Sequence, residues 1–184
     1  IKSSMTVTYK LNSSNYITCE SFDQLYKLDN YHDIQYINCY HNNLTVLPKL
    51  PEGLLYLWCS NNKLGMLPTL PTELIDLYCS NNKLLSLPEL PKSLERLNCS
   101  NNQLTMIYEL PDSLTHLWCS NNKLTILPIL PKSLTTLLYI KNPLYTYIKK
   151  FCNGKLKTYR KITTIRKITT IRKITTIFSY GFKN

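Results

Sequence analysis

Hydrophobic and polar positions repeat every 20 residues through most of this chain of 184 residues. One unit reads LLYLWCSNNKLGMLPTLPTE from Leu54, and near copies begin at Leu74, Leu94 and Leu114. The alternation Leu57-x-Cys59 predicts a short strand whose odd-numbered residues point inward. A fixed period of this size is typical of a solenoid, in which each unit buries its apolar face only against its neighbours.

A polar column follows each expected strand. Asparagine occupies the same place in every unit, and we predict an inward structural ladder made of Asn42, Asn62, Asn82, Asn102 and Asn122, with Asn142 in a partial last unit. A buried amide both donates and accepts, so it satisfies backbone groups of adjacent turns. The nearly uniform Ser and Asn residues just before this column, such as Ser60 and Asn61, indicate turn chemistry.

The second half of the unit, LPxLPxxL, carries two prolines three residues apart. Proline fixes φ, lacks an N–H and biases its predecessor away from the helical region. We therefore expect the back of the solenoid to be extended or polyproline-like rather than helical.

The ends of the chain depart from the repeat. We expect an N-terminal cap with a degenerate first repeat around Cys19 over residues 1–33, with a short helix after Ser21, which opens a capping-box pattern with Gln24. Five full repeats and a partial one occupy 34–144. A C-terminal capping helix is expected over 143–154, where Asn142 serves as helix N-cap or as the last ladder residue. Residues 155–184 form a basic, low-complexity tail with three RKITTI hexamers.

The motif LxxLxCSNNxLxxLPxLPxx resembles the short, 20-residue leucine-rich repeat of secreted bacterial effectors, with Cys where Leu is usual. Its Asn-rich and Lys-rich form is also similar to leucine-rich repeat proteins of giant DNA viruses. The resemblance implies a curved leucine-rich repeat solenoid with a parallel β-sheet on its concave face and a protein-binding role. Some bacterial relatives attach a ubiquitin-ligase domain after the repeats, but the roughly forty residues that follow here are too few for one.

The in-phase cysteines are interpreted as small apolar fillers of the inward strand face: Cys39, Cys59, Cys79, Cys99 and Cys119. Parallel strands hold equivalent residues about 4.7–4.9 Å apart, which suits neither a disulfide nor a tetrahedral metal site. Reduced thiols favour an intracellular location, which would be the host cytoplasm for a viral or effector protein. Cys152 is out of phase, and we expect it to be the most reactive thiol.

The outward strand positions differ from turn to turn, and a solenoid recognises its partner through such positions. The candidate partner-binding residues on the concave face are Tyr56, Trp58, Asp76, Tyr78, Arg96, Asn98, His116 and Trp118. Tyr, Trp and Arg dominate binding hot spots. The alternative is that these aromatic residues only stabilise the sheet by stacking on one another.

Charge is unevenly distributed along the chain. Residues 1–144 hold 11 Lys/Arg and 11 Asp/Glu, whereas residues 145–184 hold the other 11 Lys/Arg and no acid. The tail is either an expansion with no dedicated role or a basic arm for nucleic acid or an anionic membrane, with the repeats as scaffold.

The sequence contains neither a catalytic constellation nor a Gly-rich phosphate loop, and His32, His41 and His116 are scattered. We therefore predict a monomeric, non-enzymatic protein-binding module with no cofactor, no metal and no transmembrane segment. A viral or pathogen–host setting is the context that the resemblance implies.

Overall fold

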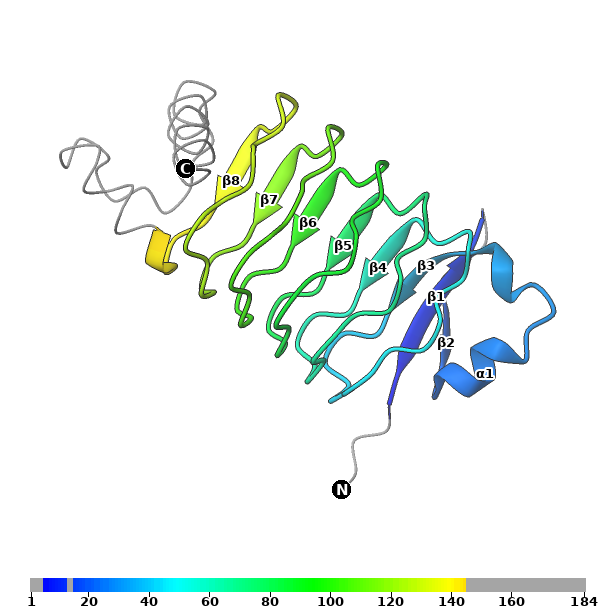
Figure 1. Cartoon of the computed structure of the whole chain (residues 1–184). Coiled ribbons are helices and arrows are strands. Elements are labelled where there is room, and N and C mark those ends of the chain that lie inside the picture. The colour runs from blue at the N-terminus through cyan, green and yellow to red at the C-terminus, as the bar shows by residue number, and fades with distance from the viewer. Residues whose placement is uncertain (1–4, 13–14, 145–184) are drawn as a thin grey trace.

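The computed structural model describes residues 5–12 and 15–144. In this part of the chain, successive turns stack along one axis and contribute strands to a single sheet with the order β2-β1-β3-β4-β5-β6-β7-β8 (Figure 1). The six repeat strands are β3 (Ile34–Asn38), β4 (Tyr56–Trp58), β5 (Asp76–Tyr78), β6 (Arg96–Asn98), β7 (His116–Trp118) and β8 (Thr136–Leu138).

The repeat strands are parallel and paired in a register set by the period of the sequence. Leu57 of β4 lies opposite Leu77 of β5, which lies opposite Leu97 of β6. Each turn therefore places equivalent residues above one another, which is the arrangement of a leucine-rich repeat solenoid. The predicted fold class is confirmed.

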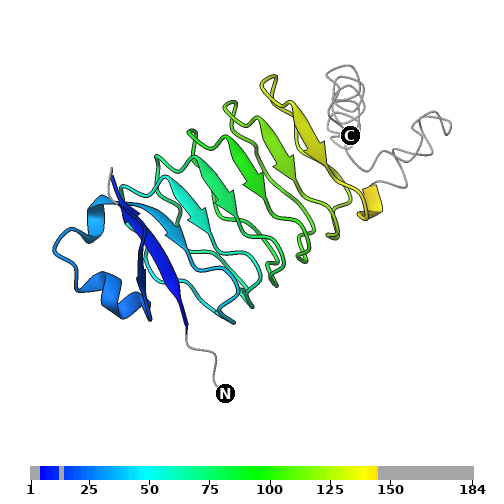
Figure 2. The same ribbon diagram turned by 180° about the vertical axis from the view of Figure 1, so that it is seen from behind.

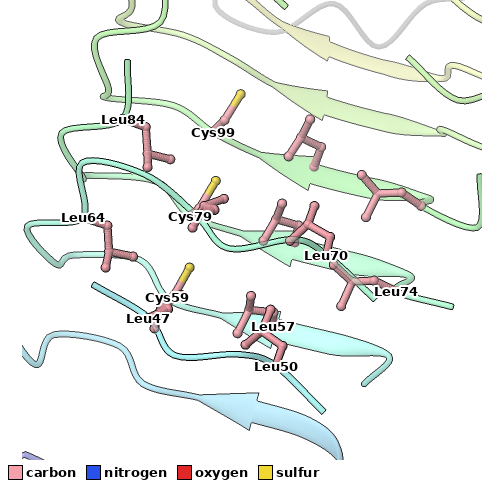
Figure 3. Packing of buried hydrophobic residues seen from close by; sticks show 14 of the residues in the cluster. Leu47, Leu50, Leu57, Cys59, Leu64, Leu70, Leu74, Cys79, Leu84 and Cys99 are labelled. Carbon is pink, nitrogen blue, oxygen red and sulfur yellow. The ribbon is translucent and has the colours of Figure 1, made fainter. Parts of the chain in front are cut away.

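The core is a column of identical side chains. Leu57, Cys59 and Leu64 are fully buried, and so are their equivalents in the next two turns. Figure 3 shows Cys59, Cys79 and Cys99 aligned from turn to turn beside the leucines. Burying a leucine contributes about 1.5–3 kcal/mol, but each turn has neighbours only above and below, so this stabilisation requires the stack.

The asparagine column links adjacent turns by hydrogen bonds. The side-chain Oδ1 of Asn62 accepts from the N–H of Asn42 (3.0 Å) and of Leu44 (2.9 Å). Its Nδ2 donates to the carbonyl oxygens of Cys39 (2.9 Å) and Cys59 (3.0 Å). One amide thus satisfies backbone groups of its own turn and of the preceding one, where water does not reach.

The chain leaves each strand through a left-handed residue. Positive φ values of 55–59° occur at His41, Asn61, Asn81, Asn101, Asn121 and Lys141. Asparagine tolerates this region better than most residues, which explains its recurrence there. The N–H of Asn61 donates to the carbonyl of Ser80 in the next turn (2.9 Å), so the turn also contributes to the stacking.

The N-terminal cap differs from a degenerate repeat. The strands β1 (Val7–Leu11) and β2 (Ile17–Cys19) form an antiparallel hairpin, and β1 pairs antiparallel with β3. Cys19 consequently lies on the outer strand, separated from the cysteine column by β1, even though its position is in phase with the repeat. Figure 2 shows the hairpin at one end of the stack and β8 at the other.

A short helix follows the hairpin, as expected from the sequence. Helix α1 (Phe22–Tyr26) begins at Ser21, whose hydroxyl accepts a 3.4 Å hydrogen bond from the N–H of Gln24. The 3₁₀ helix η1 (Tyr31–Asp33) then leads into β3. The carbonyl of His32 accepts from the N–H of Gly53 (3.2 Å), and a Cβ at Gly53 would lie only 2.7 Å from that oxygen.

Between repeat strands, the described back segments carry neither helix nor strand. The C-terminal capping helix expected over 143–154 lies outside the described residues, apart from its first two positions. Asn142 serves the ladder: its Oδ1 accepts from the N–H of Leu124 (3.0 Å), and its Nδ2 donates to the carbonyls of Cys119 and Tyr139 (both 2.9 Å).

Candidate protein-binding face

The outward residues of the strands form one surface, here called the strand face. Because side chains alternate along a strand, the first and third residues of the three-residue strands β4 to β8 point away from the core, as do Tyr36 and Asn38 of β3, which pair with them. Strand pairing aligns Tyr56 with Asp76, and Trp58 with Tyr78. The candidate residues from β4 to β7 therefore lie in two adjacent columns.

Aromatic rings contact one another across neighbouring strands, diagonally from Tyr36, which pairs with Tyr56, to Trp58, and then along the third-residue column. The ring centroids of Tyr36 and Trp58 are 5.2 Å apart, and those of Trp58 and Tyr78 are 5.8 Å apart, both edge to face. Such pairs are favourable beyond the area that they bury. Trp58 nevertheless stays 40% exposed, so stacking does not remove this ring from solvent.

Asn98 interrupts the aromatic column in sequence but not in space. The rings of Tyr78 and Trp118 lie two turns apart along the chain, yet their centroids are only 6.0 Å apart. The small carboxamide of Asn98 lies between their strands, and its Oδ1 accepts a 3.2 Å hydrogen bond from the N–H of Ser100. The rings thus form a continuous series, which we call the aromatic row.

The row extends further at both ends than its strand positions alone suggest. Tyr16, from the hairpin connection, packs edge to face on Tyr36 at 5.1 Å, and the ammonium of Lys10 lies 5.4 Å from the Tyr16 ring. His116 packs on Trp118 at 5.3 Å, and its Nδ1 lies 2.8 Å from the hydroxyl of Thr115. Burial, with a smaller effect of neighbouring Tyr16, raises the pKa of Tyr36.

An ion pair lies beside the row. The Nε of Arg96 on β6 is 2.6 Å from Oδ1 of Asp76 on the neighbouring β5. The guanidinium and the carboxylate form a close pair of opposite charges. The contact raises the pKa of Arg96, and the pKa of nearby Tyr78 is raised by burial and then by the Asp76 charge.

The ion pair affects how far Asp76 and Arg96, two of the candidate binding residues, are accessible to a partner. Asp76 is only 5% exposed, so its carboxylate is not open to a partner. The side chain of Arg96 is 37% exposed and remains accessible on one side. The structure thus brings the predicted residues together on one face, with Asp76 beneath that face as a support for Arg96.

Sequence reasoning missed the contribution of Tyr16. This residue precedes β2 in the hairpin, outside the repeat, so no period relates it to the strand face. An available signal was the alternation in VTYKL, which is typical of a strand, followed by a polar connection and a second short apolar run.

The thiols of the cysteine column are buried and unreactive in the folded protein. Cys39, Cys59, Cys79, Cys99 and Cys119 are free and buried. Burial raises the pKa of Cys39 and Cys99 to about 12, so these thiols stay protonated at neutral pH. Cys152 lies outside the described residues, and its reactivity stays a prediction.

Residues 5–12 and 15–144 show neither a metal site nor a membrane span. No group of three or more His, Cys, Asp or Glu side chains is arranged to hold a metal ion there. In the same part of the chain, the helices are too short or too polar to cross a membrane.

Comparison with known proteins agrees with this geometry. The family model described as Leucine Rich Repeat matches residues 93–112 and 113–137. Together with the stacked parallel strands, the match identifies the chain as a leucine-rich repeat protein whose repeats resemble those of bacterial effectors. No curated protein matches the sequence significantly.

Solved structures of similar fold come from bacterial effectors. The chain is 37% identical to YopM from Yersinia enterocolitica (TM-score 0.59), covering 60% of this chain and 25% of YopM. It is 39% identical to a Shigella effector leucine-rich repeat domain (TM-score 0.58), covering 59% of this chain and 50% of that domain. Its identity to YopM from Yersinia pestis, a leucine-rich effector protein, is 41% (TM-score 0.56), over 57% of this chain and 31% of the other. This chain therefore spans no more than half the length of these relatives.

Proposed function

We propose that this chain is a non-enzymatic module that binds a protein partner through the strand face. The leucine-rich repeat fold and the effector-like neighbours suggest a protein-interaction module. The observation that carries the assignment of the face is the aromatic row, which includes both tryptophans of the chain, Trp58 and Trp118.

The aromatic row suits binding better than sheet stabilisation alone. Cross-strand stacking explains why rings neighbour one another, but a ring that stays 40% exposed, such as Trp58, retains much apolar area in water. Hot spots of binding are commonly Trp, Tyr and Arg residues surrounded by weaker contacts. Arg96, held by Asp76 beside the row, adds a fixed cation that pairs with an acidic or carbonyl group of a partner.

The setting follows from the neighbours and the thiols. We propose an intracellular site of action in a viral or pathogen–host context, since the similar structures are effectors and five buried thiols are unpaired. The partner is a protein whose identity the strand face does not specify, and the module is proposed to act as a monomer.

The proposal is tested by partner capture followed by titration. Partners captured by the full chain are titrated against Trp58→Ala and Trp118→Ala, with Tyr108→Ala as the control, because Tyr108 is an exposed aromatic residue outside the strand face. Each tryptophan variant is expected to weaken binding by about 2 kcal/mol or more, roughly 30-fold. Equal affinity of all three variants would contradict the proposal.

The same experiment separates the competing role of the tail. Residues 155–184 are basic and free of acid, so an interaction through them with nucleic acid or anionic membrane weakens steeply with salt. A salt-sensitive interaction that survives both tryptophan changes and disappears on deletion of 155–184 would assign function to the tail instead.

A further inference from the structure

The loops that leave the strands form an edge of the solenoid distinct from the strand face. These loops, here called the exit edge, are residues 40–46, 60–66, 80–86, 100–106, 120–126 and 140–144. Figure 3 shows two of their buried leucines, Leu64 and Leu84, at one end of the strands, with Leu70 and Leu74 toward the other end.

Aliphatic or thioether side chains protrude along the exit edge, one from each of five successive loops. They are between 40% and 70% exposed and comprise Val46, Met66, Leu85, Met106 and Ile126. At about 4.8 Å per turn, the stripe is roughly 19 Å long. The solenoid core does not need these residues, because Leu47, Leu67 and Leu127, each one residue after a member of the stripe, are buried.

Lysines accompany the apolar stripe. Exposed lysines on the exit edge are Lys63, Lys83, Lys123 and Lys141. Their backbones are held in the stack: the N–H of Lys63 donates to the carbonyl of Leu44 (2.7 Å), and that of Lys123 to Leu104 (2.8 Å). Four of the six exit loops thus carry an exposed lysine in the same segment as the apolar stripe, with Gln103 in place of a lysine in the loop 100–106.

Acidic residues are confined to the other parts of each turn. None of the exit-edge loops contains Asp or Glu, whereas the back and strand-entry segments contain Glu52, Glu73, Glu89, Glu95, Glu109 and Asp112. Residues 34–144 hold eight Lys/Arg and seven Asp/Glu. Four of the basic residues and none of the acidic ones lie on the exit edge, so this edge is basic while the rest of the repeat region carries both signs.

We propose that the exit edge docks on the surface of an anionic lipid bilayer. Lysines attract anionic headgroups, and protruding apolar side chains enter the boundary between headgroups and acyl chains. The described chain ends at Leu144 in the last exit loop, so the acid-free residues 145–184 continue from this edge. The site is separate from the strand face, which leaves that face available for a protein partner.

A lipid surface fits the exit edge better than nucleic acid does. Binding of unpaired bases relies on aromatic rings on which the bases stack. On the exit edge such rings occur only in the first loop, at Tyr40 and His41, and the five loops from residue 60 onward contain none. Their exposed side chains are aliphatic or thioether groups beside ammonium groups, the combination expected of a membrane-surface contact.

The test measures partition of the full chain onto phosphatidylcholine vesicles with and without phosphatidylserine. The edge variant Lys63→Gln/Lys83→Gln/Lys123→Gln is compared with Lys49→Gln/Lys92→Gln/Lys132→Gln, which removes the same charge from the other parts of the turns. Each lysine near an anionic surface changes partition about fivefold, so the edge variant is expected to bind on the order of 100-fold more weakly. The control is expected to change only a few-fold.

A second pair of variants tests the apolar contribution. Met66→Ser/Met106→Ser is expected to lower partition and to leave it more salt-sensitive, whereas Tyr108→Ser/Ile129→Ser, exposed apolar residues outside the stripe, is expected to leave it unchanged. Circular dichroism checks that each variant folds. Absence of binding to phosphatidylserine vesicles would overturn the proposal. Equal losses of binding in the two lysine variants would also overturn it, because binding would then depend on the tail or on net charge. Trp58→Ala keeps the exit edge intact and is expected to bind vesicles normally.

Discussion

Removal of one ladder amide gives the sharpest test of how the turns are held together. In Asn102 the Oδ1 accepts from the N–H of Leu84 (3.0 Å), and the Nδ2 donates to the carbonyls of Cys79 and Cys99 (both 3.1 Å). The Asn102→Ala substitution deletes these three bonds and a longer one from Nδ2 to the carbonyl of Ser100 (3.4 Å), at a site that is only 8% exposed.

The cost of Asn102→Ala follows from which groups keep a partner. The carbonyl of Cys79 still accepts from Asn82 (3.1 Å), and that of Cys99 still accepts from Asn122 (3.0 Å). The N–H of Leu84 has no such second partner among the bonds of the ladder. An orphaned buried donor costs about 1–3 kcal/mol, so we expect the free energy of unfolding to fall by about 2 kcal/mol.

The matched control is Asn81→Gly. Asn81 is exposed and adopts φ 55°, a conformation that glycine accepts without strain, so we expect a loss of only a few tenths of a kcal/mol. Asn102→Asp is nearly isosteric and keeps the acceptor, but turns a second acceptor toward carbonyl oxygens. We expect it to be at least as destabilising as Asn102→Ala at neutral pH.

The measurement is urea unfolding of the full chain followed by circular dichroism, with unchanged m-values as the sign that the variants share one native state. Equal losses for Asn102→Ala and Asn81→Gly would refute the reasoning. An Asn102→Asp variant as stable as the original chain would also refute the reasoning, because the carbonyls of Cys79 and Cys99 would then not require the donor at position 102.

Three other predictions concern the same framework. Burial raises the pKa of Cys39 and Cys99 from 9.0 to about 12. Because the fold favours the neutral thiol, the stability that these residues contribute is complete below pH 9 and falls as the pH rises toward 12. Mass spectrometry should find Cys39 and Cys99 alkylated only after unfolding, with Cys152 labelled first. Arg96→Ala leaves the Asp76 carboxylate unpaired and should lower the free energy of unfolding by about 1–3 kcal/mol, less than the loss of a partner in a fully buried pair because Arg96 is partly exposed. The double variant Arg96→Ala/Asp76→Asn should regain most of that stability in urea melts. Asn61→Val places a β-branched residue at φ 57° and should cost about 1–2 kcal/mol, whereas Asn61→Gly should be near neutral by the same melts.

The repeat region could be predicted from sequence because each inward position is set by the period. Leu57 and Cys59 are buried as the alternation indicates, and Asn62 makes the expected backbone bonds. In a solenoid, one unit fixes the environment of the next, so local pattern and global fold agree.

The N-terminal cap and the details of the strand face could not be predicted in the same way. Cys19 is in phase with the column, yet it lies on an antiparallel strand, because pairing with β1 satisfies the end of the sheet without another repeat. The burial of Asp76 depends on how neighbouring side chains cover one another. Alternation predicts only that this side chain points outward.

The sharing of carbonyls between successive asparagines has a consequence for how such a chain changes its length. The carbonyl of Cys79 accepts from Asn82 in its own turn and from Asn102 in the next. The carbonyls of Cys59, Cys99 and Cys119 are shared in the same way. Deleting 20 residues in phase, or duplicating them, joins one Cys-Ser-Asn-Asn segment to another and rebuilds the same junction. The number of turns, and with it the length of the strand face and of the exit edge, can therefore vary through recombination between repeats while the N-terminal hairpin stays as it is.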